Sequence, residues 1–496
     1  MDEILGFALK LLQGGLGNLA AYLAAHVLLC LLPAFFIAGA MAALLPKEAI
    51  TRYLGRNAPK YISYPAAASA GSLLAVCSCT IVPLFAGIYK KGAGLGPAIT
   101  FLFFAPAANI LALAYTGVAI GLDLAIARLL LSLSFSISIG MIMALIFSRS
   151  DIAHDQETDQ SFAGSGRIPR RSWVFILILA ALLLSGTLKL GFLTTDYTHV
   201  ELPVAGVDRF QALLYQLVPF DPNKGEEGVS VQGAILIGLL ACIGVTAWFG
   251  LNRVDEGFNR WTWVALGLIV LTLLVAATNM TPYATGLEVR FPGKFFAVVV
   301  TLTAAAYVAR RFFEPYEVQE WLWESWRFIK QIFPLLVVGV FAVGIIRQLI
   351  RPEWIEYLAG QNTLLGNLAG VVFGVFMYFP TLVEVPIANM FLSLGMHRGP
   401  LLAYLMADPE LSLQSILIVS TIIGRLKAWV YVGWVALFST LAGLLYGAWI
   451  DGTSIWLIAL YVIAFLVVLT AGLWWVSRRN QRMMALAHRR SMVMPD

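Results

Sequence analysis

Long apolar runs are the feature of this sequence that most restricts its fold. Several of them reach the roughly 18 to 25 residues that an α-helix needs to cross a bilayer core of about 30 Å. Only 12% of the 496 residues are charged, and most charges lie in the short gaps between the runs. A water-soluble chain of this length would instead form several domains with charged surfaces. The sequence therefore predicts an all-α, polytopic membrane protein that is surrounded by the lipid bilayer.

A short polar segment from Cys77 to Pro83 interrupts one apolar run. Pro83 has no N–H, and its ring clashes with the carbonyl four residues earlier, which belongs to Cys79. We therefore expect that a regular helix cannot continue through the segment. Backbone groups freed at membrane depth must be satisfied by protein, water or a bound species. The segment, with Ser78 between the two thiols, is predicted to bind substrate.

The thiols of Cys77 and Cys79 are suited to soft, thiophilic ions. A zinc site would need about four ligands, including His or further Cys, and the sequence shows no such cluster around them. Two thiols fit a trivalent metalloid or organometalloid better, bound as substrate, and no cofactor is expected. Cys30 and Cys242 stand alone in apolar runs and are interpreted as packing residues.

Nothing in the sequence indicates ATP hydrolysis, because it contains neither a Gly-x-x-x-x-Gly-Lys-Ser/Thr loop nor a large soluble domain. We therefore expect a secondary carrier or a channel and not an enzyme. The tail carries five Arg between positions 478 and 490. This basic tail indicates cytoplasmic anchoring rather than nucleic-acid binding, and the sequence sets no oligomeric state.

The basic loops favour one orientation in the membrane. A first apolar helix, expected at 16–45, ends at a basic loop that we place in the cytoplasm. Lys90 and Lys91 follow the thiol segment, and a further basic cluster lies between 149 and 171. Both groups would be external if the thiol segment crossed the membrane fully. The positive-inside rule therefore favours a re-entrant hairpin that dips in around Cys77 to Pro83 and returns.

Helix-breaking residues recur along the chain with a shift of 303 residues. Gly71, Pro83, Gly92, Gly96, Pro97 and Pro106 fall on Gly374, Pro386, Gly395, Gly399, Pro400 and Pro409. About seven spans precede the second set in the re-entrant interpretation, so the second unit enters the membrane with opposite polarity. The sequence therefore predicts two inverted repeats, each with a re-entrant broken hairpin, and about eleven transmembrane helices.

The expected organisation has five parts. They are repeat unit 1 with the thiol hairpin (1–148), a cytoplasmic linker (149–171), inserted helices with an acidic outer loop (172–326), repeat unit 2 with the second hairpin (327–447), and the last helix with the basic cytoplasmic tail (448–496). The insert is expected to hold about four helices.

The second hairpin offers a carboxylate where the first offers thiols. Thr381, Glu384 and Pro386 are its predicted substrate-binding residues. Ionisable groups inside a membrane are costly and are candidates for function. We hypothesise that Glu384, with Asp408 of the Asp-Pro-Glu sequence at 408–410, couples proton movement to transport. The alternative for Glu384 is a structural carboxylate hydrogen-bonded within the hairpin. Asn109 is a neutral candidate for lining the substrate cavity.

The run from Cys77 to Phe103, with Pro106 and Asn109 after it, resembles the predicted permeases that include the ArsP-type organoarsenical efflux proteins. The resemblance extends into the second unit, up to Asp408. It implies an inner-membrane permease of a bacterial cell, and some members of this family export trivalent organoarsenicals through cysteine contacts. Cys77 and Cys79 would then be the substrate thiols. This chain is longer than the compact members of the family.

Together, these observations predict a multi-pass permease that exports a thiophilic metalloid species and confers arsenic resistance. Two alternatives remain. One is a membrane thiol redox protein that uses Cys77 and Cys79 as a redox pair. The other is a permease for another small solute, in which the two cysteines only pack.

Overall fold

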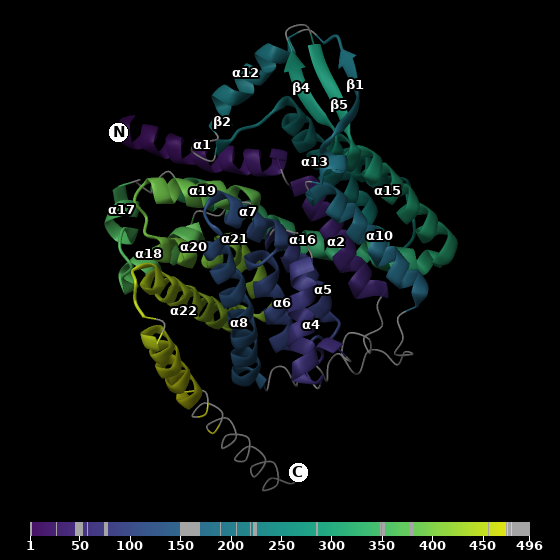
Figure 1. Cartoon of the computed structure of the whole chain (residues 1–496). Helices are drawn as coiled ribbons and strands as arrows, with labels where there is room; N and C mark the ends of the chain where they lie inside the picture. The colour runs from purple at the N-terminus through teal and green to yellow at the C-terminus, as the bar shows by residue number, and fades with distance from the viewer. Residues whose placement is uncertain are drawn as a thin grey trace, which may run out of the picture.

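The computed structural model is a bundle of mainly apolar helices with a small β-sheet at one end (Figure 1). It describes all residues except 1, 26, 45–52, 57, 74–77, 149–168, 189, 205, 219, 222–225, 284–285, 348, 350–352, 377–380, 455, 473, 475–477 and 479–496. Among the described residues, seven helices are long and apolar enough to cross a membrane, or up to eight if one bent pair is a single span. The predicted all-α, polytopic membrane fold is confirmed. The number of eleven spans stays a prediction.

The first part of the chain is helical throughout its described residues apart from short connections. Its helices are α1 (Asp2–Ala25), α2 (Val27–Leu44), α4 (Lys60–Leu73), α5 (Ser78–Lys90), α6 (Leu95–Ala107), α7 (Ile110–Ala119) and α8 (Leu122–Ile146). The single helix expected at 16–45 is wrong, because α1 and α2 share these residues and α1 lies across one end of the bundle (Figure 1). Gly15 of α1 packs closely against the helix at 315–347, because a Cβ on Gly15 would lie 2.7 Å from the ring of Phe341.

The last part of the chain forms a second helical unit. Its helices are α16 (Pro315–Arg347), α17 (Glu353–Ala359), α18 (Leu364–Phe376), α19 (Thr381–Ser393), α20 (Arg398–Leu411), α21 (Leu413–Ile423) and α22 (Arg425–Ile450). A further apolar helix covers Trp456–Gly472. The domain boundary predicted at 326–327 falls inside the continuous helix α16.

The second unit repeats the helix order of the first. Helices α5, α6, α7 and α8 begin 303 residues before α19, α20, α21 and α22, at Ser78 and Thr381, Leu95 and Arg398, Ile110 and Leu413, and Leu122 and Arg425. Both units also place a glycine with φ of 88° between the hairpin and the next helix, at Gly92 and Gly395. A left-handed φ is easy for glycine alone among the common residues. Gly92 and Gly395 therefore lie at matched places between matched helices, whereas Pro106 and Pro409 lie inside α6 and α20.

Matched glycines also hold equivalent helices close together. A Cβ on Gly140 of α8 would lie 2.6 Å from the carbonyl oxygen of Gly96 on α6. A Cβ on Gly443 of α22 would lie 2.6 Å from the carbonyl oxygen of Gly399 on α20. Small residues let helix backbones approach closely inside a membrane. The two units therefore share one packing pattern as well as one helix order.

The equivalent helices α8 and α22 lie antiparallel to each other. The start of α8 lies beside the end of α22, where the Tyr446 hydroxyl donates to Asp123 Oδ2 over 2.7 Å. Phe135 lies after Asp123 on α8, and Phe438 lies before Tyr446 on α22. The centroids of these two rings are 4.8 Å apart. In addition, α5 of unit 1 packs against α21 of unit 2. Their equivalents, α19 of unit 2 and α7 of unit 1, pack against each other in the same way. This reciprocal, antiparallel packing supports the predicted inverted repeat.

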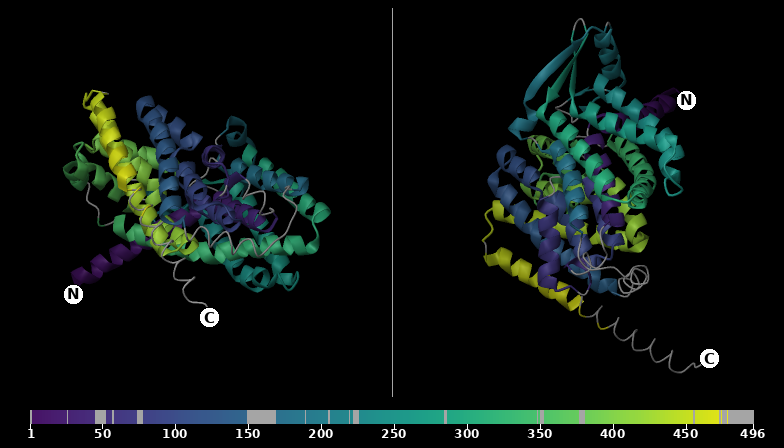
Figure 2. Two further views of the ribbon diagram at one scale, coloured as in Figure 1. Left: turned by 90° about the horizontal axis from the view of Figure 1, so that it is seen from below. Right: turned by 90° about the vertical axis from the view of Figure 1, so that its right-hand side faces the viewer.

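The inserted part contains a β-sheet in addition to the expected helices. Its elements are α10 (Arg170–Thr187), α11 (Gly191–Thr194), β1 (Asp196–Leu202), α12 (Val207–Leu217), β2 (Phe220–Asp221), β3 (Glu226–Glu227), α13 (Val231–Gly250), a 3₁₀ turn (Leu251–Arg253), α14 (Arg260–Ala277), β4 (Asn279–Tyr283), β5 (Gly286–Pro292) and α15 (Gly293–Phe312). Three antiparallel strands pair in the order β1-β5-β4, with Val200 opposite Val289 and Met280 opposite Val289. The sheet and the helix at 456–472 lie at opposite ends of the molecule (Figure 1, Figure 2).

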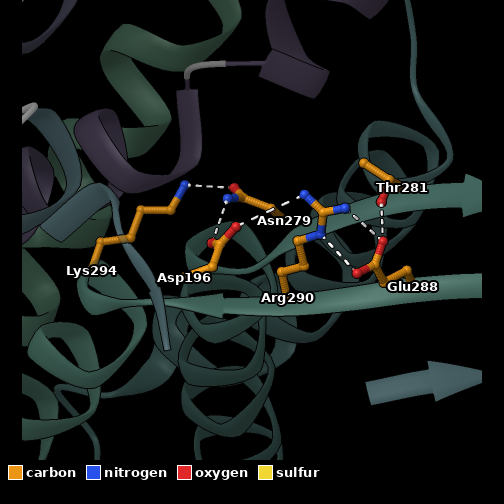
Figure 3. A network of polar contacts seen from close by, with 6 residues as sticks. All are labelled: Asp196, Asn279, Thr281, Glu288, Arg290 and Lys294. Atoms are coloured by element: carbon orange, nitrogen blue, oxygen red, sulfur yellow. Dashed lines mark hydrogen bonds and ion pairs between the residues drawn. The ribbon is translucent and has the colours of Figure 1, made fainter. Parts of the chain in front are cut away.

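A polar network fastens the base of this sheet to α15 (Figure 3). Arg290 donates two hydrogen bonds to Glu288, with Nε to Oε1 at 2.9 Å and Nη2 to Oε2 at 2.8 Å. These bonds hold the pKa of Glu288 below its usual value, because they stabilise the carboxylate. Lys294 at the start of α15 donates to Asn279 Oδ1 at 3.1 Å, which ties β4 to the helix. Asp196 of β1 accepts from the amide of Asn279 at 3.5 Å.

The glycine contacts predict different outcomes for two alanine substitutions in α22. Gly443→Ala should lower the free energy of unfolding by about 1–3 kcal/mol, because the added methyl group forces α20 and α22 apart. Gly433→Ala is the matched control, because a Cβ there meets nothing within 4 Å. It should be neutral or stabilising by up to about 1 kcal/mol through helix propensity. Thermal unfolding of both variants in detergent measures the difference, and equal melting temperatures would contradict the packing argument.

Candidate functional site

The thiol segment lies only partly within the described residues. Cys77 is outside them, while Ser78 and Cys79 begin helix α5 and their side chains are not described. Pro83 is buried, and α5 continues through it to Lys90. The expectation that no regular helix passes Pro83 is therefore wrong. Pro83 is close to the helix start and removes only one helical hydrogen bond, so the remaining bonds and the packing hold the helix together.

The second hairpin places a carboxylate at the start of α19. Glu384 lies in the first turn of that helix and is fully buried. Its Oε1 accepts a hydrogen bond from Arg128 Nη2 at 2.9 Å, and the side chains are 1% and 0% exposed. Thr381 and Pro386 belong to the same helix, and their side chains are not described. The ion pair links the hairpin of unit 2 to the last helix of unit 1.

Arg128 also binds the end of a helix in its own unit. Its Nε donates to the carbonyl of Ala107 at 2.8 Å, and its Nη1 donates to Thr116 Oγ1 at 3.3 Å. Ala107 is the last residue of α6, where helical carbonyls lack backbone partners. A cation at a helix C-terminus and an anion in a first helical turn are each favourable with the helix dipole. Arg128 and Glu384 therefore match the ends of α6 and α19.

Asn109 sits in the break between α6 and α7. It is 2% exposed, and its side chain accepts a hydrogen bond from the Ala112 amide at 2.8 Å, which caps α7. An Asn at this position satisfies one of the free N–H groups at a helix start. The structure thus gives Asn109 a capping role, and its predicted role in lining a cavity stays a prediction.

Two further carboxyl groups lie near the end of α20. Asp408 is completely buried, and a Cβ on Gly374 of α18 would lie 2.8 Å from its backbone nitrogen. Glu410 is 4% exposed, and its Oε2 accepts a hydrogen bond from the Tyr431 hydroxyl at 2.7 Å. The helix then bends by 47° into α21. Carboxyl groups therefore gather at the break of the second unit.

Sequence reasoning missed Arg128 and Tyr431. Arg128 is the one charged residue in the apolar run from Leu124 to Phe147, so a search for single charges within spans would have found it. Tyr431 carries no such signal. It follows Arg128 by 303 residues, and Glu410 follows Ala107 by the same number. Arg128 and Tyr431 thus hold equivalent places, each binding the end of the preceding broken helix.

Other features of the described residues do not add to this site. An apolar groove of about 770 Å³ lies between α10, α11 and α15, and none of the predicted site residues lines it. Among the described residues, no group of three or more His, Cys, Asp or Glu is arranged to hold a metal ion. The polar groups around α6, α8, α19 and α20 are therefore the candidate site, together with the thiol segment.

The buried ion pair predicts strong coupling between two substitutions. Arg128→Met should lower the free energy of unfolding by about 3–5 kcal/mol, because Glu384 keeps a buried charge without its partner. The double variant with Glu384→Met should cost clearly less than the sum of the two single variants. Chemical unfolding in detergent measures the cycle. The more exposed pair Arg171 and Glu317, 2.8 Å apart, is the control and should couple by about 1 kcal/mol or less. Additive effects at Arg128 and Glu384 would contradict this prediction.

Known proteins resemble this chain over almost its whole length. A family model described as a predicted permease, of the ArsP type, matches residues 14–448, which include every candidate site residue. A UPF0718 protein of Methanocaldococcus jannaschii is 31% identical over 446 residues, which are 90% of this chain and 98% of that protein. No solved structure gives a significant match. The chain therefore belongs to the ArsP-type family of predicted permeases, as the thiol segment and its repeat indicated.

Proposed function

We propose that this membrane transporter is a secondary-type permease that exports a thiophilic metalloid species, such as a trivalent organoarsenical, across a bacterial inner membrane. Membership of a permease family supports transport of a small solute. The observation that carries the finer proposal is the pair of matched hairpins, α4 with α5 and α18 with α19. One carries the sequence Cys77-Ser78-Cys79 and the other carries the buried Glu384.

The thiols supply the proposed selectivity. Two thiols one residue apart can both bond to a trivalent metalloid. Hard cations and simple organic solutes do not need thiol ligands. Ser78 and Pro83 lie on α5 of the first hairpin, and Thr381 and Pro386 occupy the matching places on α19 of the second. Arsenic resistance would follow from export, because removal of the metalloid protects cellular thiols.

The ion pair supplies a proposed link to proton movement. A proton that reaches Glu384 removes its charge and weakens its attraction to Arg128, which Ala107 and Thr116 hold on unit 1. The hairpin of unit 2 is then free to move against α8. Asp408, buried on the neighbouring helix α20, is the second proposed proton-coupling group. Rocking of one repeat against the other would follow this weakening of the contact.

Uptake into everted membrane vesicles tests the substrate proposal. Vesicles with the wild-type protein should accumulate trivalent methylarsenical, and the Cys77→Ser/Cys79→Ser double variant should lose this uptake while inserting normally. Cys242→Ser is the matched control, because Cys242 is an exposed cysteine on α13 far along the chain from the hairpin. Equal uptake by the double variant would leave cysteines that only pack. No uptake by the wild type would favour another solute or thiol redox chemistry.

The same vesicles test proton coupling at Glu384. In Glu384→Gln the amide cannot take up and release a proton, so the uptake rate should no longer respond to an imposed pH gradient. Glu256→Gln, in the exposed loop before α14, should respond as the wild type does. A Glu384→Gln variant that keeps the full response to the pH gradient would contradict a role for Glu384 in proton coupling.

A further inference from the structure

Glu410 occupies a place where a bare carboxylate has little support. It lies in the last turn of α20, which ends at Leu411, and is 4% exposed. The C-terminal end of a helix carries partial negative charge, so a second negative charge there is unfavourable. Its Oε2 accepts the hydrogen bond from Tyr431, whereas its Oε1 is buried without a hydrogen-bond partner among the described residues. Transfer of such a charge from water is expensive.

The neighbouring helices bring no cation to Glu410 in the described part of the chain. The charged or titratable side chains on α20 and on the helices packed against it are Arg398, Tyr404 and Asp408 on α20, Asp123 and Arg128 on α8, Glu384 on α19, and Arg425, Lys427, Tyr431 and Tyr446 on α22. Among the cations, Arg128 pairs with Glu384, and Arg398 pairs with Asp123 at the far end of α20. Arg425 and Lys427 lie in the first turn of α22, and in the described part of the chain neither is joined to Glu410, whose Oε2 is bound by Tyr431 and whose Oε1 has no hydrogen-bond partner.

The equivalent place in unit 1 holds a cation. There, the cation Arg128 binds the end of α6 and neutralises Glu384. In unit 2 the phenol of Tyr431 takes the place of Arg128, and a phenol brings a hydrogen bond but no charge. Equivalent positions thus bind the ends of equivalent helices, through a cation and a backbone carbonyl in unit 1 and through a phenol and a side-chain carboxyl group in unit 2.

We propose that Glu410 is a second proton-binding site of this permease and that its carboxyl group carries a proton in the conformation described here. The proton bonds to Oε1, and Tyr431 holds Oε2. When the units rock and water reaches the end of α20, the O–H bond of Glu410 breaks, the proton passes to water and a carboxylate remains. The coupling of this release to export rests on the proposed function, whereas the bound proton itself does not.

Infrared spectroscopy of the purified full-length protein tests the bound proton without any substrate. A protonated carboxyl group absorbs in the C=O stretching region apart from ionised carboxylates. The spectrum at neutral pH, in sodium-free buffer, should lose one such band in Glu410→Gln. In Tyr431→Phe the band should persist and move to higher frequency, because Oε2 loses its hydrogen bond. Glu384→Gln and Lys427→Gln should leave this band in place.

Two results would overturn the proposal. One is a wild-type spectrum with no band that Glu410→Gln removes, which would make the carboxyl group ionised. The other is a band that vanishes on addition of sodium, which would make the site a metal-cation site. Size-exclusion chromatography would reveal a Glu410→Gln variant that fails to fold. In that case the frequency shift in Tyr431→Phe still shows whether Glu410 carries a proton. Absence of arsenical uptake would defeat the proposed substrate and leave the infrared result unaffected.

Discussion

The contact between Arg128 and Glu384 is the interaction on which the centre of this molecule depends. A buried charge pair in a membrane protein is tolerable only if both partners stay matched and their remaining groups are bonded. Arg128 meets this condition by binding the end of α6, the hydroxyl of Thr116 and the carboxylate on α19 together, whereas Oε2 of Glu384 is buried without a hydrogen-bond partner among the described residues. One side chain thereby joins both parts of the broken helix of unit 1, α6 and α7, to the hairpin of unit 2.

The two units share a backbone plan and differ in chemistry. The first presents thiols at its hairpin and a cation on its last helix, and the second presents a carboxylate and a phenol at the matching places. Because the packing is reciprocal, each hairpin contacts the broken helix of the other unit. The helices that carry these hairpins thus meet the other unit, α5 at α21 and α19 at α7.

Much of this arrangement could be predicted from sequence, and the failures have physical reasons. Apolar runs predicted the helices, and recurring Gly and Pro residues predicted the repeat, because both patterns can be recognised in the sequence alone. The partner of Glu384 could not be predicted, since Arg128 lies 256 residues away and no periodicity links them. The β-sheet was missed because all seven residues of β1 are exposed and its apolar alternation is limited to Val200 and Leu202. The helix break predicted at Pro83 was wrong because the sequence does not show that a helix begins shortly before it, at Ser78.

The contacts of Gly140 with Gly96 and of Gly443 with Gly399 have a mechanical consequence. Where two backbones touch without intervening side chains, the helices cannot slide past or tilt against each other without a collision. We therefore expect each pair, α6 with α8 and α20 with α22, to move as one rigid unit. Relative motion of the helices would then concentrate outside these two pairs.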